Sequence, residues 1–232
     1  MSHSDIYAVF PVRAGSKRVV NKNIRPFAGS TLLEIKVRQL LAVSELSGVY
    51  VSSESPEMLD LAEKAGANPL LRETAFSTDD IPMTEVYAYI AGQMPEGDIL
   101  FTHATNPICG AESYQHCIET YRDMPNEFDS LTTVKEVKDF LYLDGKPLNF
   151  DPARKPRSQD LPNIVKLTHA VSILPRTLMI ECKNIMGRRP YFLSQSDVES
   201  IDIDHELDFR TAEFIYENIN LSKYSKIHVH QE

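Results

Sequence analysis

The sequence has no tryptophan, only three cysteines and no long apolar segment. Cys109, Cys117 and Cys182 cannot all pair with one another, and they form no Cys-x-x-Cys motif. We therefore expect reduced thiols of a cytoplasmic protein rather than a disulfide scaffold or a zinc site. The polar residues 1–5 and the short apolar run after them predict neither a signal peptide nor a membrane span.

Positive charge is also scarce, because 24 lysines and arginines face 33 aspartates and glutamates and leave a formal net charge of −9. Nucleic acids and anionic membranes bind basic surfaces, so neither is expected as a partner. Small anionic substrates are still allowed, since a local basic pocket can lie in an acidic protein. The length of 232 residues suits one large α/β domain, and 42% hydrophobic residues suit a globular core.

Short β-rich apolar segments alternate with amphipathic stretches over the first 134 residues. Strands are expected at residues 6–12, 49–52, 68–71, 98–103 and 130–134. Helices are expected from the capping-box sequence Thr31-Leu32-Leu33-Glu34 onward, at residues 56–65, up to about residue 93 and at residues 112–122. This alternation predicts an α/β fold with a doubly wound, mostly parallel sheet and helices on both faces.

The alternation fails between residues 135 and 166, which are rich in Pro, Asp, Lys and Arg and lack helical periodicity. We interpret this segment as an extended hairpin or arm that leaves the sheet. A strand at residues 170–174 and helices at residues 176–183 and 205–218 follow. The expected division is an α/β domain of residues 1–134 and 167–222, an arm of residues 135–166 and a loosely packed tail of residues 223–232.

The loop that follows the first strand, residues 13–23, concentrates positive charge. Arg13, Lys17, Arg18 and Lys22 lie within ten residues, and Gly15 lets the backbone approach a ligand closely. The carboxyl end of a parallel strand is where open α/β proteins bind ligands. Backbone N–H groups and cations together can wrap a triphosphate, although the sequence is not a P-loop. A solvated basic loop is the alternative.

A second candidate site lies near the end of the chain, at residues 200–204. Alternation in an extended segment places the carboxylates of Asp202 and Asp204 on one face. Two such carboxylates can hold Mg²⁺, which prefers oxygen ligands and bridges to substrate phosphates. Alternatively, Asp204 only caps the helix that follows.

Two more polar stretches are candidates for binding a second substrate. His103 ends a predicted strand and should lie beside the loop 13–23, unless it is a satisfied buried histidine. Arg157, Gln159, Lys166 and His169 belong to or follow a cationic stretch that suits an anionic substrate. A solvated loop explains that stretch equally well.

Several stretches, in order, resemble motifs of the CMP-N-acetylneuraminate synthetase (acylneuraminate cytidylyltransferase) family. Residues 12–23 are similar to its Ala-Arg-x-x-Ser-Lys-x-x-x-x-Lys-Asn, and residues 51–54 to its Val-Ser-Thr-Asp. Residues 71–73 correspond to its Leu-Arg-Pro, and residues 156–162 resemble its Pro-Arg-Gln-x-Leu-Pro. Residues 200–208 match Ser-Ile-Asp-Ile-Asp-x-x-x-Asp almost letter for letter.

The resemblance implies a Rossmann-like nucleotidyltransferase fold and a homodimer in which an arm reaches into the neighbouring subunit's site. It also implies that Mg²⁺ is the cofactor and CTP a substrate. Nucleotide binding falls to Arg13, Ser16, Lys17, Lys22, Asn23, Arg72 and Thr84, metal binding to Asp202 and Asp204, and catalysis to Arg13, Lys17 and Asp202.

The acceptor half of the family's pattern is altered. A sugar-contacting glutamine is replaced by His103, and Arg-Pro-Asn-Gly-Ala becomes residues 166–170. The resemblance implies transfer of CMP from CTP to an acidic sugar, a sialic-acid-like nonulosonic acid for surface polysaccharides, with release of pyrophosphate. Two alternatives stay open. One is a different anionic acceptor, such as an octulosonic acid or a phosphorylated or phosphonate compound, and the other is a non-catalytic nucleotide-binding homologue.

Overall fold

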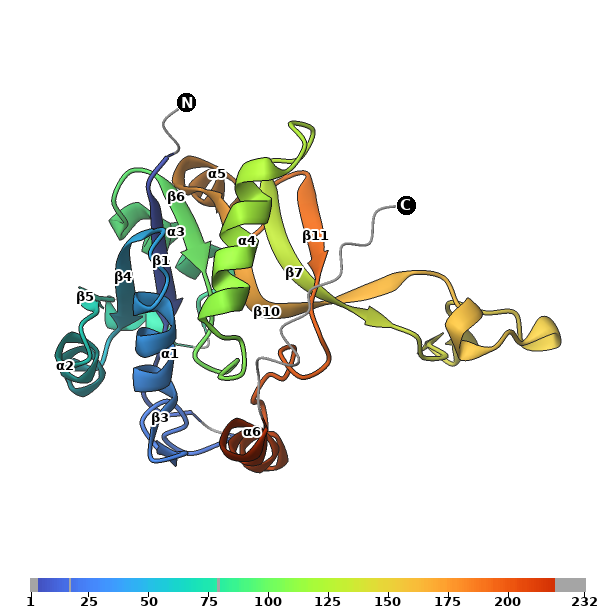
Figure 1. Cartoon of the computed structure of the whole chain (residues 1–232), viewed down its shortest axis with the longest axis horizontal. Coiled ribbons are helices and arrows are strands. Elements are labelled where there is room, and N and C mark those ends of the chain that lie inside the picture. The colour runs from blue at the N-terminus through green and yellow to red at the C-terminus, as the bar shows by residue number, and fades with distance from the viewer. Residues whose placement is uncertain (1–3, 17, 79, 220–232) are drawn as a thin grey trace.

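A single seven-stranded sheet organises the computed structural model, which describes residues 4–16, 18–78 and 80–219 (Figure 1). The strand order is β11-β7-β10-β6-β1-β4-β5. The strands are β1 (Ile6–Pro11), β4 (Leu46–Ser53), β5 (Asn68–Leu71), β6 (Asp98–Phe101), β7 (Ser130–Val137), β10 (Ile164–Pro175) and β11 (Pro190–Ser194). The helices are α1 (Leu32–Leu41), α2 (Pro56–Lys64), α3 (Met83–Gln93), α4 (Ala111–Asp123), α5 (Arg176–Cys182) and α6 (Glu206–Asn218).

The sheet is mostly parallel, as predicted, but β10 runs antiparallel to both β6 and β7. The chain passes from β7 to β10 through the arm, without a helix that crosses the sheet. Two neighbouring strands joined without such a crossover run in opposite directions. The sequence pattern predicted the hairpin but did not specify where the reversed strand inserts.

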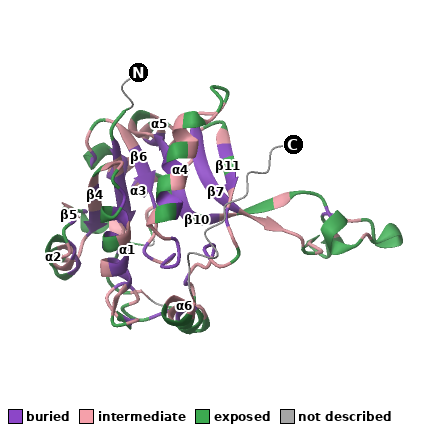
Figure 2. Ribbon diagram, viewed as in Figure 1, coloured by how far each residue is buried: buried purple, intermediate pink, exposed green. Residues whose placement is uncertain are grey.

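Helices cover both faces of the sheet because successive residues of a strand point to opposite faces. Ala8 and Phe10 of β1 belong to a core cluster that also contains residues of α1, α2, α4 and α6. Val9, between them, belongs to a second cluster with residues of α3 and α5. The central strands are accordingly buried, as Figure 2 shows. The doubly wound α/β prediction is confirmed.

Local signals set several element boundaries. Thr31 accepts a hydrogen bond from the backbone N–H of Glu34, which starts α1 at the predicted capping box. Ser55 caps α2 in the same way, with Pro56 in its first turn. Strand β11, an edge strand parallel to β7, was not predicted. Its five residues include three consecutive large apolar side chains, so the sequence shows no clear alternation there.

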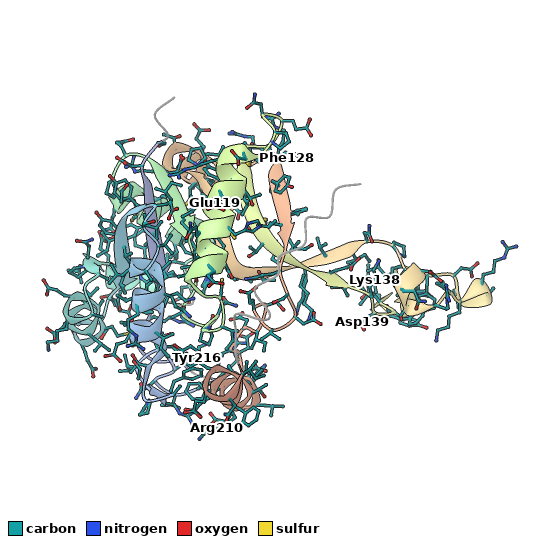
Figure 3. All side chains as sticks on the ribbon, in the orientation of Figure 1. Glu119, Phe128, Lys138, Asp139, Arg210 and Tyr216 are labelled. Atoms are coloured by element: carbon teal, nitrogen blue, oxygen red, sulfur yellow. The ribbon has the colours of Figure 1, made fainter. Side chains whose placement is uncertain are left out.

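The arm comprises residues 138–163 and projects from the sheet on a ribbon formed by the ends of β7 and β10 (Figure 1). Figure 3 shows Lys138 and Asp139 in the arm, far from Arg210 and Tyr216 on α6. Strand pairing continues to Val137 and Ile164, so the arm begins later and ends earlier than residues 135 and 166. The arm also contains the short strands β8 (Tyr142–Leu143) and β9 (Lys146–Pro147). The predicted tail lies outside the described residues.

The site is positioned by the edge of the sheet where β1, β4, β5 and β6 end. From β1 the chain winds outward to β4 and β5 and then returns to β6 on the other side of β1. This reversal creates a crevice outside the carboxyl ends of β1 and β6, which is the usual ligand position in such sheets. Within the described part of the chain, no helix is long and apolar enough to cross a membrane.

Candidate active site

A cleft of about 600 Å³ opens at this edge of the sheet. It brings together segments that are distant in sequence, and most of the predicted site residues line it. Those residues are Arg13, Ser16, Lys22, Asn23, Arg72, His103, His169, Asp202 and Asp204. Lys17 lies outside the described residues. The individual roles of all these residues stay predictions.

Lys22 joins the basic loop to the carboxylate segment. Its ammonium group donates a hydrogen bond to the backbone carbonyl of Ile203, which lies between Asp202 and Asp204. Burial lowers the pKa of Lys22, and the negative charges of Asp202 and Asp204 oppose this effect. The two motifs that the sequence suggested separately therefore meet at one cleft.

The two aspartates have different surroundings. Oδ1 of Asp202 is buried and has no hydrogen-bond partner among the described residues. Asp204 forms an ion pair with Arg18 at 2.9 Å, with both side chains about half exposed. A buried carboxylate oxygen without a donor is costly unless a cation binds there. The pair therefore fits a metal ion, whose remaining ligands would be phosphate oxygens and water.

Asp208, rather than Asp204, caps α6. Its Oδ2 accepts hydrogen bonds from the backbone N–H groups of Asp204, at 3.0 Å, and His205, at 2.7 Å. Asp208 is the third residue of α6, and this arrangement completes a capping box with His205. The alternative that Asp204 is only a helix cap is thus wrong, and its carboxylate remains at the cleft.

Glu54, at the carboxyl end of β4, holds the basic loop in place and was missed as a functional residue. It accepts hydrogen bonds from the backbone N–H of Ala14, at 2.8 Å, and from Arg72, at 3.0 Å. Arg72 is 4% exposed and also donates to the carbonyl of Val12 and to Ser77, each at 2.9 Å. Residues 51–54 were noted for their family motif, and strand-end placement was the signal that could have identified Glu54.

The pKa of Glu54 reflects this position. Burial raises the pKa, but backbone N–H groups of Glu54 and Ala14 and the guanidinium of Arg72 outweigh burial and lower it overall. Asn23 is buried as well and donates to the carbonyl of Arg13 at 3.4 Å. Arg72 and Asn23 thus hold the backbone at the start of the loop, and both also line the cleft.

One wall of the cleft is apolar and includes Phe76, whose ring stacks on Tyr89 with centroids 4.0 Å apart. The other apolar residues of this wall come from the start of α3 and the loop before it, and they are Ile81, Pro82, Met83 and Val86. Such a wall can pack against a planar base, and the cations of the loop 13–23 can bind phosphates.

His103 and His169 also line the cleft. Nδ1 of His103 lies 2.9 Å from the backbone carbonyl of His169, so this nitrogen carries the proton and Nε2 of a neutral ring is an acceptor. Burial lowers the pKa of His103, with smaller opposing effects from the His169 carbonyl and Asp202. The two rings meet edge to face, with centroids 5.7 Å apart. His103 can therefore accept a hydrogen bond from a substrate hydroxyl.

His169 adopts a left-handed conformation, with φ of 57°. Such a conformation is uncommon for residues other than glycine, which is the residue that the related motif has here. The pairing of β10 with β7 shifts register between Leu167 and Ser172, so His169 lies in a β-bulge. A bulge beside the cleft directs a side chain that a regular strand would place elsewhere.

Four predicted site residues do not line the cleft of this chain. Thr84 is exposed on α3, and Lys166 is exposed near the base of the arm. Arg157 and Gln159 are exposed within the arm, where Arg157 pairs with Asp160 at 3.0 Å. For Arg157, Gln159 and Lys166, the sequence could not show this separation because it depends on how far the arm projects.

The sequence profile of the family described as cytidylyltransferase matches residues 7–228. The chain belongs to the cytidylyltransferase family. This membership confirms the family resemblance and makes the chain a CTP-dependent nucleotidyltransferase. The chain is 27% identical to CMP-N,N'-diacetyllegionaminic acid synthase of Legionella pneumophila over 226 residues, which are 91% of this chain and 96% of that protein.

This cytidylyltransferase is also similar to a second curated protein and to a solved structure. It is 27% identical over 164 residues to pseudaminic acid cytidylyltransferase of Campylobacter jejuni, with 66% of this chain and 71% of that protein covered. Its fold is similar to that of CMP:2-keto-3-deoxy-manno-octonic acid synthetase complexed with CTP. The TM-score is 0.67 at 13% identity, and the match covers 92% of this chain and 98% of the other. At that identity the structural likeness shows the fold alone.

Proposed function

We propose that this cytidylyltransferase transfers CMP from CTP to an acidic sugar of the nonulosonic class and releases pyrophosphate. The observation that carries the proposal is the junction of the loop 13–23 with Asp202 and Asp204, made by the hydrogen bond from Lys22 to Ile203. A triphosphate in the cleft then meets cations on one side and a carboxylate pair on the other. Two relatives are named for legionaminic acid and pseudaminic acid, and these names support the acceptor class.

The reaction joins an acceptor oxygen to the α-phosphorus of CTP as the bond from that phosphorus to pyrophosphate breaks. Nucleotidyl transfer depends mainly on alignment and on neutralisation of charge. Arg13, Lys17 and Lys22 stabilise the negative charge that accumulates on pyrophosphate. Ser16 and Asn23 help to hold the loop and the nucleotide, and Glu54 fixes the backbone at Ala14 so that these groups are preorganised.

Asp202 and Asp204 are proposed to hold Mg²⁺ together with phosphate oxygens. The buried, partnerless Oδ1 of Asp202 supports this assignment. When bound, the metal supplies charge to the α-phosphate and a lower pKa for the attacking hydroxyl. Arg18 pairs with Asp204 in this structure, and it can turn to the triphosphate when Asp204 binds a cation.

His103 and His169 are proposed to contact the acceptor, and a homodimer is proposed to supply the rest of its binding site. The arm exposes apolar side chains, Tyr142, Leu143 and Leu148 among them, which a second subunit can cover. Arg157, Gln159 and Lys166 then reach the partner's cleft. Because the three cysteines are free, we place the reaction in the cytoplasm, a reducing compartment.

Pyrophosphate release tests the activity. CTP, UTP, ATP and GTP are each combined with Mg²⁺ and with N,N'-diacetyllegionaminate, pseudaminate, N-acetylneuraminate or 3-deoxy-manno-octulosonate. We expect turnover only with CTP, and fastest with a nine-carbon acid. Preference for the octulosonate would favour the alternative acceptor that the changes at His103 and His169 left open. CTP binding without turnover of any acid, phosphorylated or phosphonate compound would indicate a non-catalytic homologue.

A subunit-mixing experiment tests the arm. Arg157→Ala and Asp202→Asn are each expected to be nearly inactive alone. If the arm acts on the partner's cleft, a mixed dimer contains one site with an intact cleft and an intact arm, so mixing restores activity. If each arm serves its own chain, mixing restores nothing. Light scattering on the unmixed protein checks that the dimer exists.

A further inference from the structure

Three consecutive backbone carbonyl groups of the β10 bulge are held by one segment, residues 102–106. Thr102 donates from its hydroxyl to the carbonyl of Ala170 at 2.6 Å. His103 donates from Nδ1 to the carbonyl of His169 at 2.9 Å. Asn106 donates from Nδ2 to the carbonyl of Thr168 at 3.3 Å. The left-handed turn that carries His169 is therefore fixed on both sides and at its centre.

Asn106 also reaches the carboxylate segment. The same Nδ2 donates to the carbonyl of Ile201 at 3.2 Å, next to Asp202. The side chain is fully buried, and its Oδ1 has no partner among the described residues. A flipped amide would bring Oδ1 against two carbonyl oxygens, so the observed orientation is the only one that satisfies them. Among the described residues, Asn106 is therefore held through its amide nitrogen alone.

The backbone of Asn106 is itself anchored by a buried cation. Lys36 of α1 is 0% exposed and donates to the Asn106 carbonyl at 2.9 Å and to the hydroxyl of Tyr114. Tyr114 in turn lies 3.0 Å from the hydroxyl of Thr102. No carboxylate among the described residues pairs with Lys36, so its burial is costly, yet here it fixes both ends of residues 102–106. The segment thus has little freedom to shift relative to α1.

We propose that Asn106 is a positioning residue that sets the spacing between the acceptor side of the cleft, at His169, and the metal side, at Asp202. The proposal rests on the proposed function, because it assigns His169 to the acceptor and Asp202 to Mg²⁺. Asn106 touches neither substrate and acts through the carbonyls of Thr168 and Ile201. The hydrogen bonds of its side chain go to β10 and to the carboxylate segment, so it affects the acceptor and the metal rather than the nucleotide alone.

The test compares Asn106→Ala with Ser130→Ala. Ser130 is equally buried, but it lies at the opposite edge of the sheet, where it accepts a hydrogen bond from the N–H of Gly187 at 2.9 Å. Both variants lose a buried polar contact and should show a lower Tm. Only Asn106→Ala should raise the KM of the best acid from the acceptor panel, by about tenfold or more. Its KM for CTP at saturating Mg²⁺ should change less than twofold.

A second readout needs no acceptor. Calorimetric titration of Mg²⁺ into protein saturated with CTP should give a several-fold weaker affinity for Asn106→Ala and an unchanged one for Ser130→Ala. This titration separates the inference from the proposed function, because it remains valid if no tested acid is turned over. If Asn106→Ala fails to fold, Asn106→Ser, whose hydroxyl is too short to reach both carbonyls, is measured instead.

The proposal is overturned if the Asn106 variant loses stability but keeps the wild-type Mg²⁺ affinity and acceptor KM. In that case Asn106 serves the fold alone, as Ser130 does. A uniform loss of CTP affinity, acceptor affinity and Mg²⁺ affinity overturns it as well, since it would show general disorder of the cleft.

Discussion

Lys22 and Ile203 are 181 positions apart in sequence, and a hydrogen bond from the lysine ammonium to the Ile203 carbonyl joins them. This bond places the end of the loop 13–23 against the segment that carries Asp202 and Asp204. A cation between a triphosphate and two carboxylates has two tasks. It balances charge, and it holds the carboxylate segment at a fixed distance from the loop.

Lys22→Met removes the charge and the hydrogen bond but keeps most of the side-chain length. We expect kcat/KM for CTP to fall by roughly 10²-fold, the usual scale for loss of one electrostatic stabiliser. Lys64→Met is the matched control, because Lys64 pairs with Asp60 on the surface of α2. Steady-state pyrophosphate release measures both variants. Equal kcat/KM values for the two variants would show that Lys22 has no role in the reaction.

Glu54→Gln tests the contacts of Glu54 with Arg72 and with the backbone of Ala14. The buried Arg72 loses its charged partner, which we expect to lower the free energy of unfolding at pH 7 by about 2 kcal/mol. The KM for CTP should rise because the backbone at Ala14 is held less firmly. Urea unfolding and steady-state kinetics check these expectations, and a variant with wild-type values in both would show that the contact is dispensable.

The same variant has a defined pH dependence. The pKa of Glu54 is lowered from 4.5 in the folded protein, so its contribution is complete above pH 4.5 and is lost as the pH falls through the lowered folded pKa. The stability difference between wild type and Glu54→Gln should therefore shrink below pH 4.5. A difference that stays constant down to pH 3 would contradict the assignment.

Lys36 should make the free energy of unfolding increase as the pH rises from 7.5 to 10.5. Burial lowers its pKa to about 8, whereas the unfolded chain has the ordinary value of 10.5. Between these values the unfolded state binds more protons, so raising the pH favours folding. Relative to Lys36→Met, wild type should gain up to about 3 kcal/mol between pH 7.5 and 10.5. Urea unfolding of both proteins at several pH values measures this gain, and parallel curves would contradict it.

His169→Gly should separate stability from function. Glycine adopts the left-handed conformation without strain, although it also makes the unfolded chain more flexible. We expect a net gain of roughly 0.5 kcal/mol in the free energy of unfolding. Loss of the imidazole should raise the acceptor KM severalfold, while the KM for CTP changes little. A more stable variant with unchanged acceptor KM would show that His169 does not contact the acceptor.

The sequence predicted the elements that positioned the site. Residues 6–11 and 68–71 are short apolar strands, and a capping box starts α1, so the doubly wound sheet followed from local pattern. The edge strand β11 was missed because it is short and its sequence does not alternate between polar and apolar residues. The arm was predicted to begin at residue 135 and end at residue 166, where the composition changes, but the pairing of β7 with β10 continues to Val137 and Ile164.

Within the site, residues whose own chemistry is distinctive were predictable. Asp202 and Asp204 alternate on a short segment, and the loop 13–23 concentrates cations. Glu54 and Asn106 were not identified, since their importance lies in hydrogen bonds to backbone groups 40 and 95 positions away. Such contacts depend on tertiary packing, which no local pattern encodes.

The central claim is that the loop 13–23 and the aspartates at 202 and 204 form one metal-dependent nucleotide site. Calorimetric titration of CTP, with and without Mg²⁺, into wild type, Asp202→Asn and the surface control Asp60→Asn tests it most directly. We predict that Mg²⁺ strengthens CTP binding at least tenfold in wild type and in Asp60→Asn, and that Asp202→Asn stays folded but loses this enhancement and all turnover. An Asp202→Asn variant that binds CTP with the full Mg²⁺ enhancement and releases pyrophosphate at the wild-type rate would contradict the account.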